Sequence, residues 1–554
     1  MSALFSATEQ PSAAAGISAA FALGVSLHLG LFRHGDWNLY TTRIILGIFA
    51  VYGLLTGAFF RLASFTIGQA FKAAAPLVLA TLAGTYSSIL IYRGFFHRLG
   101  RFPGPSAAKF SNFYITSLTV KKFQKYEEIK TLHDKYGDYV RVGPSMLSVL
   151  DPAAFHAIHS NASPCGKGPF YNVMHPVVSL HMIKDIKEHA ARRKTWDKGF
   201  GSKALRDYEP RVALHTKQLL SRVQDSNGAP FNASQWFNFY SFDIMGDLAF
   251  NKSFNMLRDG VKHYYMESVH LNMLFVGAFS HLVWLFPLFK ETPGLNGEHI
   301  KFQKWLSAQV AERRKQKPEL PDVFSWILAD YDALDRPTEQ DTVNLHGDAH
   351  LIVVGGSDTT AAALTCLFFE LSVNPEATRR LQQELDEYFT VEAEPGHASL
   401  AKLKYLQACI DEALRLHPPV PSGVERMTPP QGLQVGDTFI PGNTVVQIPT
   451  HALHRDKRVF ERPNEFIPER WTTQRELTKD DSVFAPFSIG RFGCVGRQLG
   501  LMELRYVSAE ILRQYDVKLA GEDTARRFLD GLKDGFTMAC PNLDVVFTPR
   551  AEAT

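Results

Sequence analysis

The sequence has few cysteines and no cluster of them. Its 554 residues include five, which are Cys165, Cys366, Cys409, Cys494 and Cys540. They are odd in number, lie far apart and contain no Cys-x-x-Cys pair, which argues against a disulfide framework and against a zinc site of the usual spacing. The soluble part of the protein is therefore expected to face a reducing compartment.

The chain also has little net charge. The formal value is +3 at pH 7, and neither a Lys/Arg-rich tail nor an alternation of basic and aromatic residues is present. A groove for nucleic acid would need such features. The sequence therefore predicts no nucleic-acid partner.

Charged residues are missing altogether from three stretches near the N-terminus. Residues 13–32, 44–60 and 73–92 contain no Asp, Glu, Lys or Arg. Each is close to the roughly 20 residues that a helix needs to cross a bilayer. A cleavable signal peptide is the weaker interpretation, because no basic residue precedes the first stretch and two more apolar stretches follow. Residues 1–100 are predicted to be a membrane anchor.

Basic residues around the anchor predict its orientation. Arg93, Arg98 and Arg101 follow the third stretch, whereas residues 1–16 contain no Lys or Arg. Basic residues stay on the cytosolic side, so the large C-terminal domain is expected in the cytosol. Residues 101–108 are rich in proline, which stiffens the backbone, and are predicted to be a hinge.

The remaining residues, 109–554, predict one large domain that is mainly α-helical with small β-sheets. Two strands are expected over 139–142 and 146–150, and a short helix capped by Asp151 with Pro152 at its first position follows. Most of the region from 180 to 390 has helical patterning, and β-branched residues return near 439–447.

One cysteine stands in a glycine-rich segment, residues 487–496, whose sequence is FSIGRFGCVG. Glycine allows close backbone approach and positive φ. A helix that begins just after Cys494 would point its positive dipole end at the sulfur and favour the thiolate. Such a thiolate could bind a metal or attack an electrophile. The alternative is a small buried cysteine in a glycine-rich turn.

Three further segments carry charged or polar residues at helical spacing. Glu412 and Arg415 are three residues apart and can pair on one helix face. His189 and Arg193 also share a face, where the arginine fork would suit a carboxylate, although a solvated basic surface is the alternative. Residues 355–360, GGSDTT, interrupt an apolar helical run. Two glycines within a helix cost roughly 1 kcal/mol each, which suggests that another group lies close to this backbone. A glycine-kinked helix with a solvent-facing Asp is the alternative.

Together these segments resemble the cytochrome P-450 family, and the resemblance extends over most of the chain. The heme-binding pattern of that family, Phe-x-x-Gly-x-x-x-Cys-x-Gly, is matched at every fixed position by Phe487, Gly490, Cys494 and Gly496. The resemblance implies the cytochrome P-450 fold. It also implies heme b (iron protoporphyrin IX) as cofactor, with Cys494 as the axial ligand of the iron.

The resemblance also implies roles for the other motifs. Glu412 and Arg415 match the Glu-x-x-Arg motif of the family, and Arg470 matches its second arginine, so the three are expected to form a buried charge network. Losing one member would leave a buried charge uncompensated, at about 3–5 kcal/mol. Asp358 and Thr359 match the residues that deliver protons during oxygen activation. The heme propionates are expected to bind the residues His189, Arg193 and Arg426.

The sequence departs from the family at one position. The family usually has Arg or His two residues before the cysteine, where it contacts a propionate. Phe492 stands there in this chain, and Arg491 precedes it. Either Arg491 reaches the propionate by another path, or that contact is lost.

The implied function is that of a monooxygenase, which inserts one oxygen atom from O2 into a lipophilic organic substrate. Electrons would come from NADPH through a separate NADPH-cytochrome P-450 reductase, with cytochrome b5 as an optional second donor, because the chain has no flavin or dinucleotide fingerprint. The anchor and the loop around Arg491 and Phe492 are similar to those of fungal secondary-metabolism members, which implies a multi-pass protein of the endoplasmic reticulum. A heme-thiolate isomerase or dehydratase that does not use O2, and a non-catalytic heme-binding membrane protein, remain as alternatives.

Overall fold

The computed structural model describes residues 9–550 and divides the chain into two compact units. The first unit contains the described residues up to Tyr114, together with Arg141–Ser145 and His281–His299. The second contains the rest of the chain. The outermost residues of the predicted anchor and of the predicted large domain lie outside the described residues.

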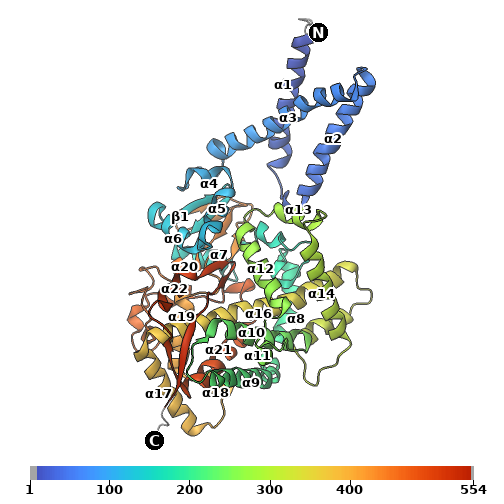
Figure 1. Ribbon diagram of the computed structural model, residues 1–554. Helices are drawn as coiled ribbons and strands as arrows, with labels where there is room; N and C mark the ends of the chain where they lie inside the picture. The colour runs from blue at the N-terminus through green and yellow to red at the C-terminus, as the bar shows by residue number, and fades with distance from the viewer. Residues whose placement is uncertain (1–8, 551–554) are drawn as a thin grey trace. The chain divides into compact units, whose positions relative to one another are not determined.

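The first unit is built on three long helices, shown in blue in Figure 1. They are α1 (Glu9–Leu27), α2 (Thr41–Leu62) and α3 (Ile67–Ile91), with α3 packed against both others. Single π-helical turns extend α1 to Phe32 and α3 to Phe96. The unit is completed by α4 (Ser106–Phe110) and α13 (Leu285–Glu291), and α13 packs against α2 although more than 200 residues separate them.

Small residues let α1 and α3 approach closely. A Cβ atom added at Gly84 would lie 2.1 Å from the carbonyl oxygen of Phe21, and one added at Gly24 would lie 2.0 Å from that of Thr81. Thr85 Oγ1 donates a hydrogen bond of 3.0 Å to the carbonyl oxygen of Gly24. Such small-residue contacts are how helices associate where lipid offers no hydrophobic drive between them.

Within the described residues 9–550, four helical segments are long and apolar enough to cross a membrane. Three of them are Ala13–Phe32, Asn38–Leu62 and Ile67–Phe96; the first coincides with the stretch expected from the sequence, and the other two contain the expected stretches and are longer. The fourth, Glu339–Val373, has 72% of its most apolar window buried inside the protein, so it is a core helix. The long apolar N-terminal helices indicate membrane anchoring; whether all three cross the bilayer, and the boundaries at residues 100 and 108, stay predictions.

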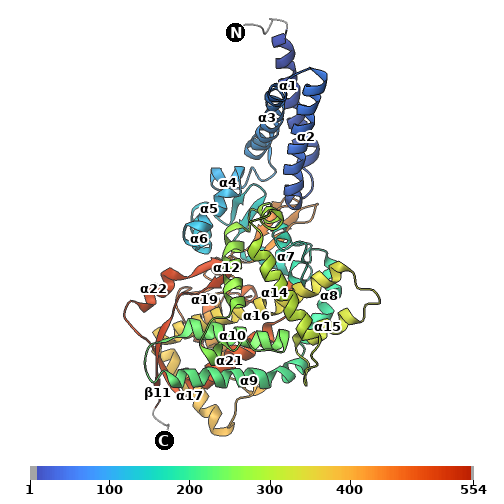
Figure 2. The ribbon, with the colours of Figure 1, turned by 45° about the vertical axis from the view of Figure 1, so that its right-hand side comes forward.

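The second unit is mainly helical, as the sequence predicts. Its central element is α16 (Glu339–Val373), along which α10 (Ala233–Phe250) packs; Figure 2 shows both beside α21 (Arg497–Leu512). The other helices, two of which (α5 and α14) begin in the first unit, are α5 (Phe113–Lys122), α6 (Lys125–Tyr136), α7 (Pro152–His159), α8 (Ile186–Gly199), α9 (Ser202–Asp225), α11 (Met256–Asp259), α12 (Tyr264–Phe279), α14 (Gly297–Arg314), α15 (Val323–Asp332), α17 (Pro375–Val391), α18 (His397–Leu400), α19 (Lys404–Leu416), α20 (Thr450–Leu453) and α22 (Thr524–Gly531).

The strands are short and form small sheets. In one sheet β7 (Val445–Gln447) pairs in parallel with β2 (Met146–Val149) and antiparallel with β4 (Glu425–Met427). In another, β11 (Asp544–Pro549) lies between β3 (Phe231–Asn232) and β8 (Tyr515–Leu519). The remaining strands are β1 (Tyr139–Gly143), the pair β5 (Leu433–Val435) and β6 (Thr438–Ile440), and the pair β9 (Lys533–Gly535) and β10 (Thr537–Ala539). The structure confirms the predicted N-cap, since Asp151 accepts from Ala153 N at 2.9 Å.

Candidate active site

Cys494 lies in a tight turn between a short 3-10 turn, Gly490–Phe492, and the start of α21. Its amide donates to the carbonyl oxygen of Phe487 at 2.9 Å, which fixes the turn. Gly490 has a φ of +72°, and an added Cβ would lie 2.2 Å from the carbonyl oxygen of His159. Only glycine fits there without a backbone shift. The turn therefore holds the cysteine where its side chain faces a large internal cavity.

Two opposing influences act on the Cys494 thiol. Burial raises its pKa, because the charged form loses hydration. The amides of Gly496 and Arg497 at the start of α21, and the cations of Arg193 and Arg497, lower it. Burial is the largest of these influences, so the helix start predicted from the sequence reduces the cost of a thiolate without overcoming it. A bound metal cation would supply the missing stabilisation.

The predicted proton-delivery residues, Asp358 and Thr359, lie on α16. The two glycines that precede them on this helix, Gly355 and Gly356, have different surroundings. Gly356 faces α10, where an added Cβ would come within 2.6 Å of the Met245 side chain, so a larger residue would displace that side chain. Gly355 faces the cavity, and an added Cβ would meet only Leu351 at 3.8 Å. Thr359 also lines the cavity and donates from Oγ1 to the carbonyl oxygen of Gly355 at 2.9 Å.

Asp358 points away from the cavity, into the protein. Its side chain is buried, and its Oδ1 atom lies 3.2 Å from Nε2 of His270 on α12, at an angle outside hydrogen-bond geometry. His270 is 41% exposed, so it lies between the buried carboxylate and the solvent. This contact could not be predicted from the sequence, because α12 and α16 are far apart along the chain.

The predicted propionate ligands come together at the cavity wall. His189 and Arg193 on α8 and Arg426 on β4 all line it. Arg193 Nη1 donates to the carbonyl oxygen of Gly493 at 2.7 Å, beside the cysteine, and Arg426 Nη1 donates to the Tyr171 hydroxyl at 2.9 Å. Burial lowers the pKa of His189 to about 4, and the cations of Lys167 and Arg193 add to the effect. His189 is therefore a neutral hydrogen-bonding group at pH 7.

Lys167 is a further basic residue of the same wall, and it was not predicted from the sequence. It stands between two glycines in the segment that follows α7, where no helical spacing marks it out. By contrast Arg192, next to Arg193 in sequence, turns away and pairs with Asp348 on α16.

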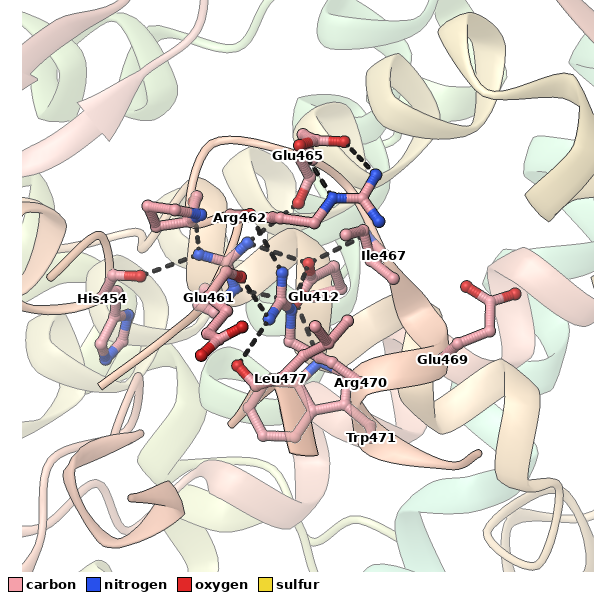
Figure 3. Close-up of polar contacts among 12 residues, drawn as sticks. Glu412, His454, Glu461, Arg462, Glu465, Ile467, Glu469, Arg470, Trp471 and Leu477 are labelled. Carbon is pink, nitrogen blue, oxygen red and sulfur yellow. Dashed lines mark hydrogen bonds and ion pairs between the residues drawn. The ribbon is translucent and has the colours of Figure 1, made fainter. Parts of the chain in front are cut away.

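Figure 3 shows a buried charge network centred on Glu412. Glu412, Arg415 and Arg470 are all fully buried. The Glu412 carboxylate accepts from Arg415 Nε and Nη2 and from Arg470 Nε, each at 2.9 Å. It also accepts from the backbone amide of Ile467 at 2.9 Å and from Trp471 Nε1 at 3.0 Å. The structure thus brings the three predicted network residues together.

The network connects to the cysteine loop through His454. Arg415 Nη1 donates to the carbonyl oxygen of His454 at 2.8 Å. The His454 ring accepts at Nε2 from the amide of Ala485, at 3.4 Å, and lines the cavity beside residues 485–488. The segment that leads to Cys494 is therefore connected to α19 through His454.

The donors around this cavity fit an iron porphyrin. Cys494 offers one soft ligand, and the basic wall of Lys167, His189, Arg193 and Arg426 suits two carboxylates. Arg426 Nε is buried without a hydrogen-bond partner among the described residues, which leaves one donor for an anion. Most other lining residues are apolar, as a macrocycle requires: Phe155, Leu180, Met245, Leu351, Ile352, Ala363, Leu414, Val420, Val424, Ile448 and Leu499.

Comparison with known proteins decides the family. The sequence model of the cytochrome P450 family matches residues 105–547 of this chain. The protein belongs to the cytochrome P450 family. Membership implies a heme-thiolate centre, a redox partner and an organic substrate.

Three relatives illustrate where this P450 belongs. It is 55% identical over 533 residues to the cytochrome P450 monooxygenase FCK2 of Fusarium pseudograminearum. The aligned residues cover 96% of this chain and 97% of that protein. It is 38% identical to the monooxygenase phqL of Penicillium fellutanum, over 97% of this chain and 95% of the relative. It is 36% identical to the tryprostatin B 6-hydroxylase of Neosartorya fischeri, over 95% and 97%. The chain is a P450 monooxygenase of fungal secondary-metabolite biosynthesis.

Proposed function

We propose that this P450 hydroxylates a lipophilic small molecule with electrons from NADPH, delivered by a membrane-bound NADPH-cytochrome P450 reductase. Cytochrome b5 serves as an optional second donor. The three N-terminal helices span the endoplasmic reticulum membrane and leave residues 109–554 in the cytosol. The observation that carries the proposal is that Cys494, Thr359 and the basic wall line one cavity.

Each residue of the site has a separate task. Cys494 is the thiolate ligand, and Phe487, Gly490 and Gly496 shape the turn that presents it. The heme supplies the activation of O2, favoured by thiolate ligation. The propionates bind His189, Arg193 and Arg426. The network of Glu412, Arg415 and Arg470 holds the cysteine loop in place.

Proton delivery is the task of α16. The Thr359 hydroxyl accepts no hydrogen bond from the described residues, and its own proton is held by the Gly355 carbonyl, so its lone pairs face the cavity. Asp358 is the buried acid next to it, and His270 lies 3.2 Å from that carboxylate on the solvent side. A proton can then move from solvent to Asp358 and on toward the cavity without opening it to water.

Tryprostatin B is the first compound to test as a substrate, because a relative with 36% identity is named for its hydroxylation. The apolar lining favours a ligand that partitions from lipid. Turnover without NADPH would instead favour the isomerase or dehydratase alternative, which needs no electrons from outside.

We expect Thr359→Val to uncouple electron use from product formation. Valine keeps the volume and removes the hydroxyl, so product per NADPH should fall about tenfold, the effect of losing one hydrogen bond of roughly 1.4 kcal/mol in the reaction. NADPH consumption should stay within about twofold of the wild type, with the difference appearing as hydrogen peroxide. The measurement is product, NADPH and peroxide in membranes supplemented with the reductase.

Thr365→Val is the matched control for this variant. Thr365 lies on the same helix and also donates to the carbonyl four residues earlier, at 2.7 Å from Ala361, but it does not line the cavity. It should leave the ratio of product to NADPH unchanged. Equal coupling in Thr359→Val and the wild type would refute the role given to Thr359.

A further inference from the structure

Arg141 is buried in the first unit of the structure, and most of its N–H donors have no acceptor. It lies on β1 and is 0% exposed. A guanidinium has five N–H donors. Its Nη2 donates to the carbonyl oxygens of Arg93 at 3.3 Å and Pro144 at 2.8 Å, whereas Nε and Nη1 have no partner among the described residues. Buried donors without an acceptor are costly, so this arginine has room for a ligand in its hydrogen-bond balance.

The backbone around Arg141 fixes its place at the end of α3. The Arg141 amide donates to the carbonyl oxygen of Pro103 at 2.7 Å. Gly104 has a φ of +157°, and an added Cβ would lie 2.3 Å from the carbonyl oxygen of Arg141. The segment predicted to be a hinge therefore packs directly on β1. Because Arg141 also contacts the carbonyl of Arg93, its guanidinium is held beside the π-helical turn that ends α3.

Further cations of the first unit lie around the same point. Burial lowers the pKa of His97, which follows the last turn of α3, to about 3. The cations that lower it further are those of Arg141, Arg98, Arg93 and Arg33. At pH 7 His97 is therefore neutral, and these guanidiniums share one small region. They come from the end of α1, the end of α3 and β1, so only the folded chain brings them together.

The charge balance of this cluster indicates an anion. Within residues 9–550, no carboxylate forms an ion pair with Arg33, Arg93 or Arg141. Arg33 and Arg93 lie at the C-terminal ends of α1 and α3, where the negative end of a helix dipole stabilises a cation. Arg141 lies on a strand and has no such compensation. A phosphate group would supply it, because its oxygens accept several hydrogen bonds from guanidinium groups.

The apolar surroundings of the cluster favour a lipid over a dissolved ion. Phe95 and Phe96, in the last turn of α3, are 80% and 72% exposed. The guanidinium carbon of Arg33 lies 4.5 Å from the ring centroid of Tyr92. Exposed aromatic rings next to basic residues are typical of the depth at which lipid headgroups meet acyl chains. A phospholipid matches both features, since its phosphate suits the arginines and its chains suit the phenylalanines.

We propose that Arg141 is the centre of a binding site for the phosphate group of an anionic phospholipid. Arg33 and Arg93 complete the site at the ends of α1 and α3. A headgroup with a quaternary ammonium, such as that of phosphatidylcholine, would bring a further cation among the arginines and binds less well. None of these three residues lines the heme cavity. The inference goes beyond the oxidation reaction, and it rests on the proposed function only in the membrane placement of the N-terminal helices.

The test is the lipid that accompanies the full-length holoprotein out of a mixed membrane. The protein is reconstituted in nanodiscs of phosphatidylcholine and phosphatidic acid in equal amounts and extracted into mild detergent, and its bound lipid is identified by native mass spectrometry. The wild type should retain phosphatidic acid with about tenfold preference. Arg141→Met keeps an unbranched side chain but removes the charge and the donors. It should lose the preference, which is the effect of one charge-assisted hydrogen bond.

Two further variants separate a built site from the general attraction of cations to an anionic surface. Arg33→Met removes an exposed cation, at little risk to folding, and should lower the preference about threefold. Lys109→Met removes a cation of α4, which also follows α3 in the chain, and should leave the preference unchanged. Equal losses in Lys109→Met and Arg141→Met would overturn the site. So would a full preference in both Arg33→Met and Arg141→Met.

Inorganic phosphate distinguishes a lipid from a dissolved anion as the ligand. At the concentration of the phosphatidic acid it should displace no more than about a tenth of the bound lipid, because it lacks the acyl chains. Displacement of half the lipid would overturn the assignment to a phospholipid.

Failure of this inference can be told apart from failure of the proposed function. A wild type that retains phosphatidic acid but gives no red-shifted carbon monoxide Soret band would overturn the proposed function alone. A wild type with the band and without a lipid preference would overturn the phosphate site alone. Release of the wild type from membranes by alkaline carbonate would overturn the membrane placement and, with it, this inference.

Discussion

Replacing Cys494 with serine is expected to abolish the red-shifted Soret band that carbon monoxide produces in the dithionite-reduced protein. The reason is local: the Cys494 side chain faces the cavity between the Phe487 carbonyl, which fixes its amide, and the start of α21. Serine fits the same turn but offers an alcohol, which is too weak an acid to act as the anionic ligand. Monooxygenase activity should fall below detection.

The control for this experiment is another cysteine of the same chain. Cys540 is half-buried and does not line the cavity. Its Sγ atom lies 3.9 Å from the Sγ atom of Cys366. Cys540→Ser should therefore keep the band at wild-type intensity per folded protein. A retained band in Cys494→Ser would move the thiolate ligand to another residue and remove the basis of the proposed site.

Local patterns predicted much of the site and of the fold. The residues 487–496, the Glu412–Arg415 spacing and the Asp151 cap depend on contacts within a few positions of each other, so the sequence displays them directly. The same holds for the apolar N-terminal helices, although α2 and α3 begin several residues before the stretches expected from the lack of charge.

Contacts between distant segments could not be predicted in this way. Lys167 meets Phe492, and His270 meets Asp358, only because the fold brings separate elements together. The segment His281–His299 joins the N-terminal helices for the same reason. Gly356 is a mixed case. The sequence shows that a glycine lies within a helix, but not that the Met245 side chain on α10 packs against it.

Removing the charge of Glu412 should destabilise the protein by about 3–5 kcal/mol, because Glu412→Gln leaves two fully buried arginines without a counter-ion. The urea concentration at which the Soret band is lost should fall accordingly. Glu376→Gln is the control: Glu376 also pairs with two arginines, Arg379 and Arg380, but at the surface, where solvent screens the charges, so its urea midpoint should stay close to that of the wild type. Equal urea midpoints for the two variants would contradict the buried network as a source of stability.

The hydrogen bonds of Arg415 and Arg470 to the backbone explain why this network is charged rather than apolar. A buried ion pair can often be replaced by apolar residues of similar volume without loss. Here, however, Arg415 also donates to the carbonyl oxygens of His454, Pro463 and Glu465, and Arg470 to those of Glu461, Arg462 and Leu477.

An apolar triple variant, Glu412→Leu with Arg415→Met and Arg470→Met, would remove the buried charges but leave these carbonyls without donors, at about 1–3 kcal/mol each. We therefore expect it to lose heme at lower urea than Glu412→Gln, because the chain segments that carry His454 and lead to Cys494 would no longer be tied to α19. A triple variant as stable as the wild type would show that only charge balance matters at this site.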